Sequence, residues 1–224
     1  KPIKVSRAAQ THAGTYYFAD GEGWINASDL STTDNRIEAV QKVLNEKYNN
    51  QERISVYVKQ LDTGKIAAIN DEKSMYAASV AKLGVLYYAQ ERLSHKKLSL
   101  SDEYQYTSAV NGFPGAYDPD GSGKISKMPD DKNYSLENLL KAVAQNSDNV
   151  ATNILGYYVA NQYDHSFQKS VDKASATSWN MDKKELTAKA AGTLMESVYR
   201  QNGDIINYLS STDYDGERIS KNID

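Results

Sequence analysis

Two short polar motifs, each adjoining an apolar stretch, constrain this chain more than any other feature of its sequence. Residues 79–82 read SVAK and lead directly into the apolar run 83–89, and residues 147–149 read SDN. A serine and a lysine three residues apart lie on one face of a helix, as neighbours. A lysine desolvated there loses part of its preference for the charged form and can take the proton of the serine. The pair predicts a nucleophile, Ser79, with Lys82 as its base.

The context of Ser79 separates it from other serines with the same spacing. Ser-x-x-Lys also begins at Ser94, Ser166 and Ser170, but in polar surroundings where the lysine would stay solvated and charged. Ser79 starts an apolar helix, where unpaired N–H groups and the helix dipole favour a developing anion. The alternative, a serine that only caps a core helix, is disfavoured because the SDN motif also adjoins a helix.

Composition excludes several kinds of protein. With 224 residues the chain can bury a core, and its net charge of −3 with evenly spread lysines and arginines predicts no nucleic-acid partner. Cysteine is absent and the three histidines are scattered, so thiol chemistry, a zinc site and any other cofactor are not expected. No apolar run approaches the roughly 20 residues of a transmembrane segment. The sequence shows no signal peptide and starts at Lys1, as a processed or trimmed chain would.

The first thirty residues differ from the rest. Segments 14–18 and 24–25 are rich in β-forming residues and flank Asp20-Gly21-Glu22-Gly23, which predicts a hairpin. This region resembles the last strands of the SH3-like Gly-Trp repeats that anchor Gram-positive surface proteins to the cell wall. We expect residues 1–32 to be the tail of such a module; the alternative is a hairpin that decorates the main domain.

Residues 33–224 have the pattern of one α+β domain. Apolar positions predict a helix behind a Thr33-Asp34 cap, then strands at 53–58 and 65–69 joined by a tight turn. Further helices are expected after Ser79, from Ser135 to the SDN motif, directly after that motif, and from Thr187 to Gly203. A hairpin followed by many helices favours an antiparallel sheet packed on helices.

The motifs and their flanks resemble those of the class A β-lactamase and penicillin-binding protein superfamily. The similarity covers roughly residue 33 to the C-terminus and is carried by three stretches, YAASVAK at 76–82, the second motif with its flanking helices at 134–155, and the helix leading from 186 to 195. It implies a β-lactamase-like α+β fold, with a short β segment before it.

The resemblance also implies roles for individual residues. Ser79 would be the acylated nucleophile and Lys82 its activating base. Ser147 would relay a proton to the leaving nitrogen, and Asn149 would hold an amide of the substrate. Asp148 would brace its loop rather than touch the substrate. The backbone N–H of Ser79 would supply half of an oxyanion hole.

One departure from the family pattern concerns deacylation. Class A enzymes carry a glutamate in a Trp-Glu-x-x-Leu-Asn segment, and it activates the water that releases the acyl group. Here the segment begins Trp179-Asn180, and an amide cannot accept that proton. Asp182 or Glu185 are the alternatives, although the sequence places neither. We therefore expect slow deacylation or a peptidase-like role rather than efficient β-lactam turnover.

A second departure lies at the C-terminus. The third motif of the family, Lys-Thr-Gly or a variant, would lie on a strand beyond Asp224, and later strands would complete the sheet. We therefore expect a fragment of a longer protein, or strands supplied from elsewhere, because a two-stranded hairpin alone is marginal.

Residues 118–125, DPDGSGKI, match several positions of a twelve-residue calcium loop. The last position of such a loop, where an acid is expected, is occupied by Pro129, and Asp130 lies one residue later. A plain Gly/Asp turn is the favoured interpretation, and such a turn could shape the rim of the active-site groove.

Two functions are consistent with the sequence. The first is a serine hydrolase that forms an acyl-enzyme with β-lactams or with D-Ala-D-Ala-type wall peptides. The second is a non-catalytic cell-wall-associated binding protein on the same fold. The four residues Ser79, Lys82, Ser147 and Asn149 favour the first, whereas Asn180 favours the second. The resemblances imply a secreted or cell-surface protein, from a Gram-positive organism.

Overall fold

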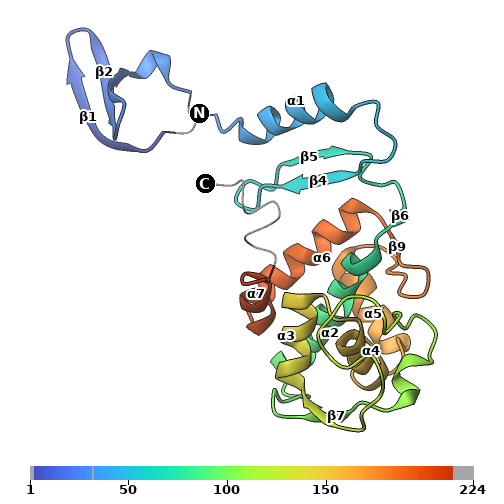
Figure 1. Cartoon of the computed structure of the whole chain (residues 1–224). Helices are drawn as coiled ribbons and strands as arrows, with labels where there is room; N and C mark the ends of the chain where they lie inside the picture. The colour runs from blue at the N-terminus through green and yellow to red at the C-terminus, as the bar shows by residue number, and fades with distance from the viewer. Residues whose placement is uncertain (1–2, 32, 214–224) are drawn as a thin grey trace. The chain divides into compact units, whose positions relative to one another are not determined.

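The computed structural model describes residues 3–31 and 33–213, and its contacts divide the chain into two compact units, residues 1–70 and 71–224. The expected α+β architecture of helices and antiparallel strands is confirmed, with the strands in several small sheets. Seven α-helices and nine short strands lie within the described residues (Figure 1). The expected domain boundary between residues 32 and 33 stays a prediction.

The first unit begins with a three-stranded antiparallel sheet. Strands β2 (Gly14–Ala19) and β3 (Gly23–Asn26) form the expected hairpin, and β1 (Val5–Thr11), which was not anticipated, pairs with β2. Gly21 and Gly23 take φ values of 84° and 85° in the turn, a conformation that other residues rarely adopt. A short 3-10 turn, η1 (Ala27–Asp29), follows the sheet.

The same unit contains a helix packed on a hairpin. Helix α1 (Arg36–Tyr48) is followed by the antiparallel strands β4 (Val56–Lys59) and β5 (Ile66–Ile69), as the sequence predicted. Ile37 and Leu44 of the helix and Ala67 of the hairpin form a small buried core. The N-cap of this helix is Asn35, the residue directly after the predicted Thr33-Asp34 cap.

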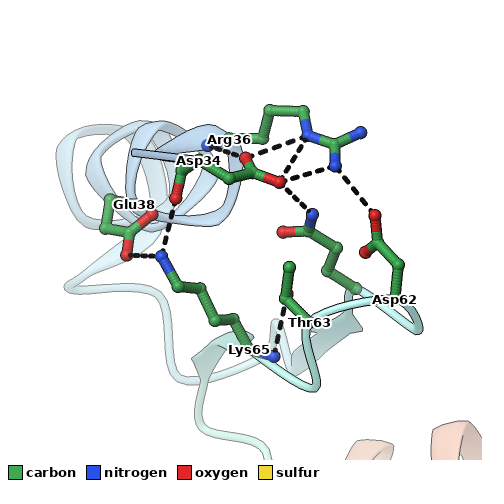
Figure 2. A network of polar contacts seen from close by, with 7 residues as sticks. Asp34, Arg36, Glu38, Asp62, Thr63 and Lys65 are labelled. Carbon is green, nitrogen blue, oxygen red and sulfur yellow. Dashed lines mark hydrogen bonds and ion pairs between the residues drawn. The ribbon is translucent and has the colours of Figure 1, made fainter. Parts of the chain in front are cut away.

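Charged side chains connect the start of α1 to the turn of the β4–β5 hairpin (Figure 2). Arg36 bonds Asp34 at 2.6 Å and Asp62 at 3.0 Å, while the Lys65 ammonium donates to the Asp34 carbonyl at 2.6 Å and pairs with Glu38 at 2.7 Å. The hydrogen bonds from Arg36 hold the pKa of Asp34 well below its usual range. This network fixes the helix on the hairpin and contains no residue of the two motifs.

The second unit is mostly helical. The first motif lies in the 3-10 turn η2 (Ala78–Lys82), and the second motif lies at the junction of helices α3 (Leu136–Asn146) and α4 (Asn149–Tyr158). The elements of this second unit are, in chain order, β6 (Met75–Tyr76), η2 (Ala78–Lys82), α2 (Leu83–Ser94), β7 (Glu103–Gln105), η3 (Ser108–Asn111), β8 (Asn133–Ser135), α3 (Leu136–Asn146), α4 (Asn149–Tyr158), α5 (His165–Ser175), β9 (Glu185–Leu186), α6 (Ala188–Gln201) and α7 (Asp204–Leu209).

Helix α2 forms the centre of this unit and contacts each of α3, α4, α5, α6 and α7 (Figure 1). Its Gly84 has no side chain because the indole of Trp179 lies there; an added Cβ would approach the indole nitrogen to 2.6 Å. That nitrogen donates to the carbonyl of Ala81 at 3.1 Å. The segment containing Trp179 is thereby fixed beside the start of α2.

The helix caps follow the sequence closely. Ser135, Asp148 and Thr187 each accept a hydrogen bond from a backbone N–H in the first turn of their helix, at the starts of α3, α4 and α6. Helices α5 and α7 and the two-stranded pairs β6–β9 and β7–β8 were not predicted. None of the described helices is long and apolar enough to cross a membrane.

Candidate active site

The first motif forms a 3-10 turn, η2, rather than the first turn of the α-helix that the sequence predicted. A 3-10 helix has three residues per turn, so residues at i and i+3 eclipse one another. Ser79 and Lys82 therefore lie on the same side of the turn. Ser79 is exposed, whereas Lys82 is 2% exposed. The turn combines an accessible hydroxyl with a desolvated amine.

The backbone before Ser79 is held in an unusual conformation. Ala78 has a φ of 47°, in the left-handed region, which costs a non-glycine residue about 1–3 kcal/mol unless its surroundings fix it. The Tyr117 hydroxyl donates to the Ala78 carbonyl at 3.2 Å, and the Ala77 N–H donates to the carbonyl of Lys184 at 2.8 Å. These contacts hold the turn that presents Ser79.

Lys82 joins the two motifs. Its Nζ lies 2.6 Å from the carbonyl oxygen of Ser147, 3.1 Å from the Ser147 hydroxyl and 2.6 Å from Oδ1 of Asn149. These three acceptors match the three donors of an ammonium group. The ring of Tyr117 lies 4.7 Å from the same nitrogen. The structure thus brings together Lys82, Ser147 and Asn149, with Ser79 on the same turn as Lys82.

Burial lowers the pKa of Lys82 to about 8, because the charged form loses its hydration. The carboxylate of Asp148 opposes this shift, whereas Lys127 and Lys184 add to it. A lysine with this pKa is partly neutral near neutral pH, and the neutral amine has a lone pair that can accept a proton.

The second motif forms the junction between α3 and α4. Ser147 ends α3 in the left-handed conformation, with φ 53°, and remains half-buried. Asn149 is 8% exposed, and its Nδ2 donates to the Asp118 carbonyl at 2.7 Å. An amide nitrogen carries two hydrogens. The amide-binding role predicted for Asn149 therefore depends on the second N–H.

Residues 118–125, the segment that matches part of a calcium loop, pack against the second motif. The hydroxyl of Ser122 donates to the Ser147 carbonyl at 2.8 Å, and the Lys127 ammonium donates to the Gly121 carbonyl at 2.6 Å. The loop must approach closely, since a Cβ at Gly123 would lie 2.3 Å from the Asp148 carboxyl carbon. Among the described residues, no group of three or more acidic, histidine or cysteine side chains could hold a metal ion. The loop has the contacts of a packed rim.

Asp148 fixes this loop to α4. Its fully buried carboxylate accepts from the backbone N–H groups of Lys124 at 2.6 Å, Ile125 at 2.9 Å and Ala151 at 2.9 Å. These contacts brace the loop, as predicted for Asp148.

We expect Asp148→Ala to lower the free energy of unfolding by about 3 kcal/mol, since it removes a helix cap and leaves buried N–H groups unpaired. Urea denaturation of the chain measures the loss. Asp148→Asn, which keeps one acceptor oxygen, should lose less. Equal stability of the alanine variant and the original chain would contradict the bracing role.

The segment after Trp179 contains no carboxylate in a buried position. Asn180 is half-buried, and its Oδ1 accepts from the Lys183 N–H at 2.8 Å. Asp182 and Glu185, the two alternatives, are exposed. Asn180 and Asp182 line an open pocket of about 290 Å³, and Ser79 is not among the residues that line it.

Two residues next to the motifs were not found by sequence reasoning. Tyr117 is buried in a loop, and nothing in the local sequence marks it as different from the other tyrosines. Lys184 stands in a charged run that predicts solvent exposure, but it is only 9% exposed. The ring of Tyr117 contacts Lys82, and Lys184 contacts the same ring, because the fold brings distant segments together.

Solved structures show where this fold occurs. The chain is similar to the structure of PBP-A (14% identity, TM-score 0.64, covering 79% of this chain and 70% of that one). It is also similar to a β-lactamase from Sphaerobacter thermophilus (16% identity, TM-score 0.62, 86% and 75%) and to the D-alanyl-D-alanine carboxypeptidase DacD from Francisella tularensis (17%, TM-score 0.57, 71% and 40%). At these identities the likeness shows the fold. No curated protein sequence is close enough to count as a relative.

The fold is therefore that of the β-lactamases and penicillin-binding proteins, a class of serine hydrolases. Residues 35–224 match the Beta-lactamase enzyme family, and the chain belongs to it.

Proposed function

We propose that this chain is a serine acyl-transfer enzyme in which Ser79 is the nucleophile and Lys82 its base. The observation that carries the proposal is the buried amine of Lys82, bonded to Ser147 and Asn149 and placed three residues after an exposed serine. Desolvation lowers the pKa of this lysine to about 8, which suits it to accept a proton.

The reaction balances with these residues alone. Ser79 Oγ attacks the carbonyl carbon of an amide or β-lactam as its proton passes to Lys82 Nζ, and the backbone N–H of Ser79 contributes to stabilising the oxyanion. The C–N bond then breaks. The leaving nitrogen takes a proton from Lys82 through the Ser147 hydroxyl, which lies 3.1 Å from Lys82. An ester on Ser79 remains, with the substrate amide held by Asn149.

The substrate class is a β-lactam or a D-Ala-D-Ala-type peptide of the cell wall. Two similar structures support this choice: one is a PBP-A mutant described as an acyl-enzyme complex with penicillin G, and the other is a D-alanyl-D-alanine carboxypeptidase. Peptidoglycan peptides would make this a protein of the cell surface. The Gly-Trp-like segment at 1–32, interpreted as the tail of a wall-binding module, supports secretion from a Gram-positive cell.

Intact-mass spectrometry of the chain during incubation with benzylpenicillin tests the proposal. We expect an adduct with the mass of the intact drug that persists while little drug is hydrolysed, because Asn180 cannot deprotonate a water. If the incubation yields no adduct and no hydrolysed drug, the proposal that this chain is an enzyme is contradicted. Binding of a D-Ala-D-Ala peptide without either reaction would then favour the non-catalytic wall-binding alternative.

Replacing Asn180 by glutamate should shorten the lifetime of the adduct at least about tenfold, since a positioned carboxylate acts as a general base for water. The decay of the adduct after removal of free drug measures this lifetime. Asn180→Gln is the matched control, with the same length and no base. If both variants decay equally, residue 180 does not reach the ester, and deacylation depends on another group.

A further inference from the structure

Lys184 is a lysine outside both motifs that connects to the segment before Ser79. Its backbone carbonyl accepts from the Ala77 N–H at 2.8 Å, and its own N–H donates to the Asn180 carbonyl at 3.0 Å. The residue has a φ of 53° and is buried. The main chain of Lys184 thus links the turn after Trp179 to the turn that presents Ser79.

The side chain of Lys184 reaches the ring that Lys82 also contacts. Its Nζ donates to the Gly115 carbonyl at 3.1 Å and lies 4.5 Å from the centroid of the Tyr117 ring. Lys82 Nζ lies 4.7 Å from the same centroid. Two points at these distances from a third are at most about 9 Å apart. Two positive charges at that separation in a partly buried site repel each other appreciably.

The charged groups that act on Lys82 and Lys184 lie on neighbouring segments of the second unit. Lys127 and Asp148 act on Lys82, from the loop over the second motif and from the start of α4. Asp182 acts on Lys184, favouring its charged form against the desolvation that lowers its pKa. The phenols of Tyr76 and Tyr163 act on Tyr117, and burial raises the pKa of both Tyr117 and Tyr163, so these two phenols stay neutral at physiological pH. Lys184 thus places its ammonium on the Tyr117 ring that Lys82 also contacts, and within the described residues no carboxylate forms an ion pair with it.

We propose that Lys184 is a positioning residue whose ammonium, held on Tyr117 and the Gly115 carbonyl, favours the neutral amine of Lys82 that takes the proton of Ser79. This inference rests on the proposed function for the use made of Lys82. The physical coupling between the two lysines does not depend on it, and it can be measured without a substrate.

The direct test is an NMR titration of the Lys82 ε-carbon, assigned by its disappearance in Lys82→Arg. Lys184→Gln removes the charge and keeps a donor for Gly115, whereas Lys184→Arg keeps the charge. We expect Lys184→Gln to raise the pKa of Lys82 by on the order of one unit, and Lys184→Arg to leave it near its original value. An unchanged pKa in Lys184→Gln would overturn the proposal.

The pH profile of acylation by benzylpenicillin is the second readout. In Lys184→Gln the midpoint of the rise should shift to higher pH by the same amount, with the plateau at high pH retained. A merely structural role would lower the rate at every pH without moving the midpoint, which would also overturn the proposal. If the original chain is not acylated, the proposed function fails, and the titration of Lys82 still decides the role of Lys184. If Lys184→Gln does not fold, Lys184→Met offers a second neutral variant for the same measurement.

Discussion

Replacing Ser79 by alanine is expected to abolish the covalent adduct with benzylpenicillin, a loss of more than about 10⁴-fold in acylation rate. Alanine has no Oγ to form the ester, and the substitution deletes one exposed hydroxyl without touching the buried contacts of Lys82. The fold should therefore survive. Intact mass of the variant under the same incubation measures the loss, and its thermal unfolding midpoint should match that of the original chain.

Ser147→Ala provides the matched comparison, because it removes the other serine hydroxyl of the two motifs, which lies 3.1 Å from Lys82 Nζ and belongs to a half-buried residue. We expect this variant to form the adduct slowly rather than not at all, since it loses only the proton relay. If Ser79→Ala were labelled as fast as the original chain, the nucleophile would lie elsewhere, and Ser147 would be the first candidate.

Replacing Lys82 by methionine is expected to lower the acylation rate by about 10²–10⁴-fold, the contribution typical of a positioned general base. Methionine keeps the buried volume but cannot accept the Ser79 proton. In the original chain the rate should rise with pH through the Lys82 pKa of about 8, and this rise should be absent from the variant. Adduct formation followed over a pH series measures both effects.

The same variant tests the Lys82 pKa through stability. The folded value of about 8 lies below the ordinary 10.5, so between these pH values the unfolded chain holds a proton that the folded chain does not. The stability of the original chain relative to Lys82→Met should therefore rise with pH in this window, by about 2–3 kcal/mol over its full width. A difference that does not change with pH would mean that Lys82 titrates normally in the folded protein.

Much of the helical architecture could be predicted because local signals agree with packing. Ser135 and Thr187 are strong caps placed directly before amphipathic stretches, and both helices begin there. Helix α5 was not predicted because its buried side is narrow, with the apolar residues Phe167 and Val171 among polar ones. Strand β1 is almost entirely exposed, so its sequence shows no hydrophobic alternation.

The candidate site could be predicted only where its residues stand in motifs. Ser79 and Lys82 share one turn, and the SDN motif marks a helix junction, but the bond between Lys82 and Asn149 joins residues 67 positions apart. Tyr117 and Lys184 reach the site from loops, where no periodic pattern reports burial. Their contacts arise from tertiary packing, which a local pattern does not encode.

Localising the penicilloyl group within the chain tests the central claim most directly. After acylation and digestion with trypsin, cleavage at Lys73 and Lys82 releases a peptide that contains Ser79 together with Ser74. Fragmentation of this peptide should place the added mass on Ser79, and Ser79→Ala should yield the peptide without it. The adduct found on any other residue, or absent from the acylated chain's 74–82 peptide, would contradict the account.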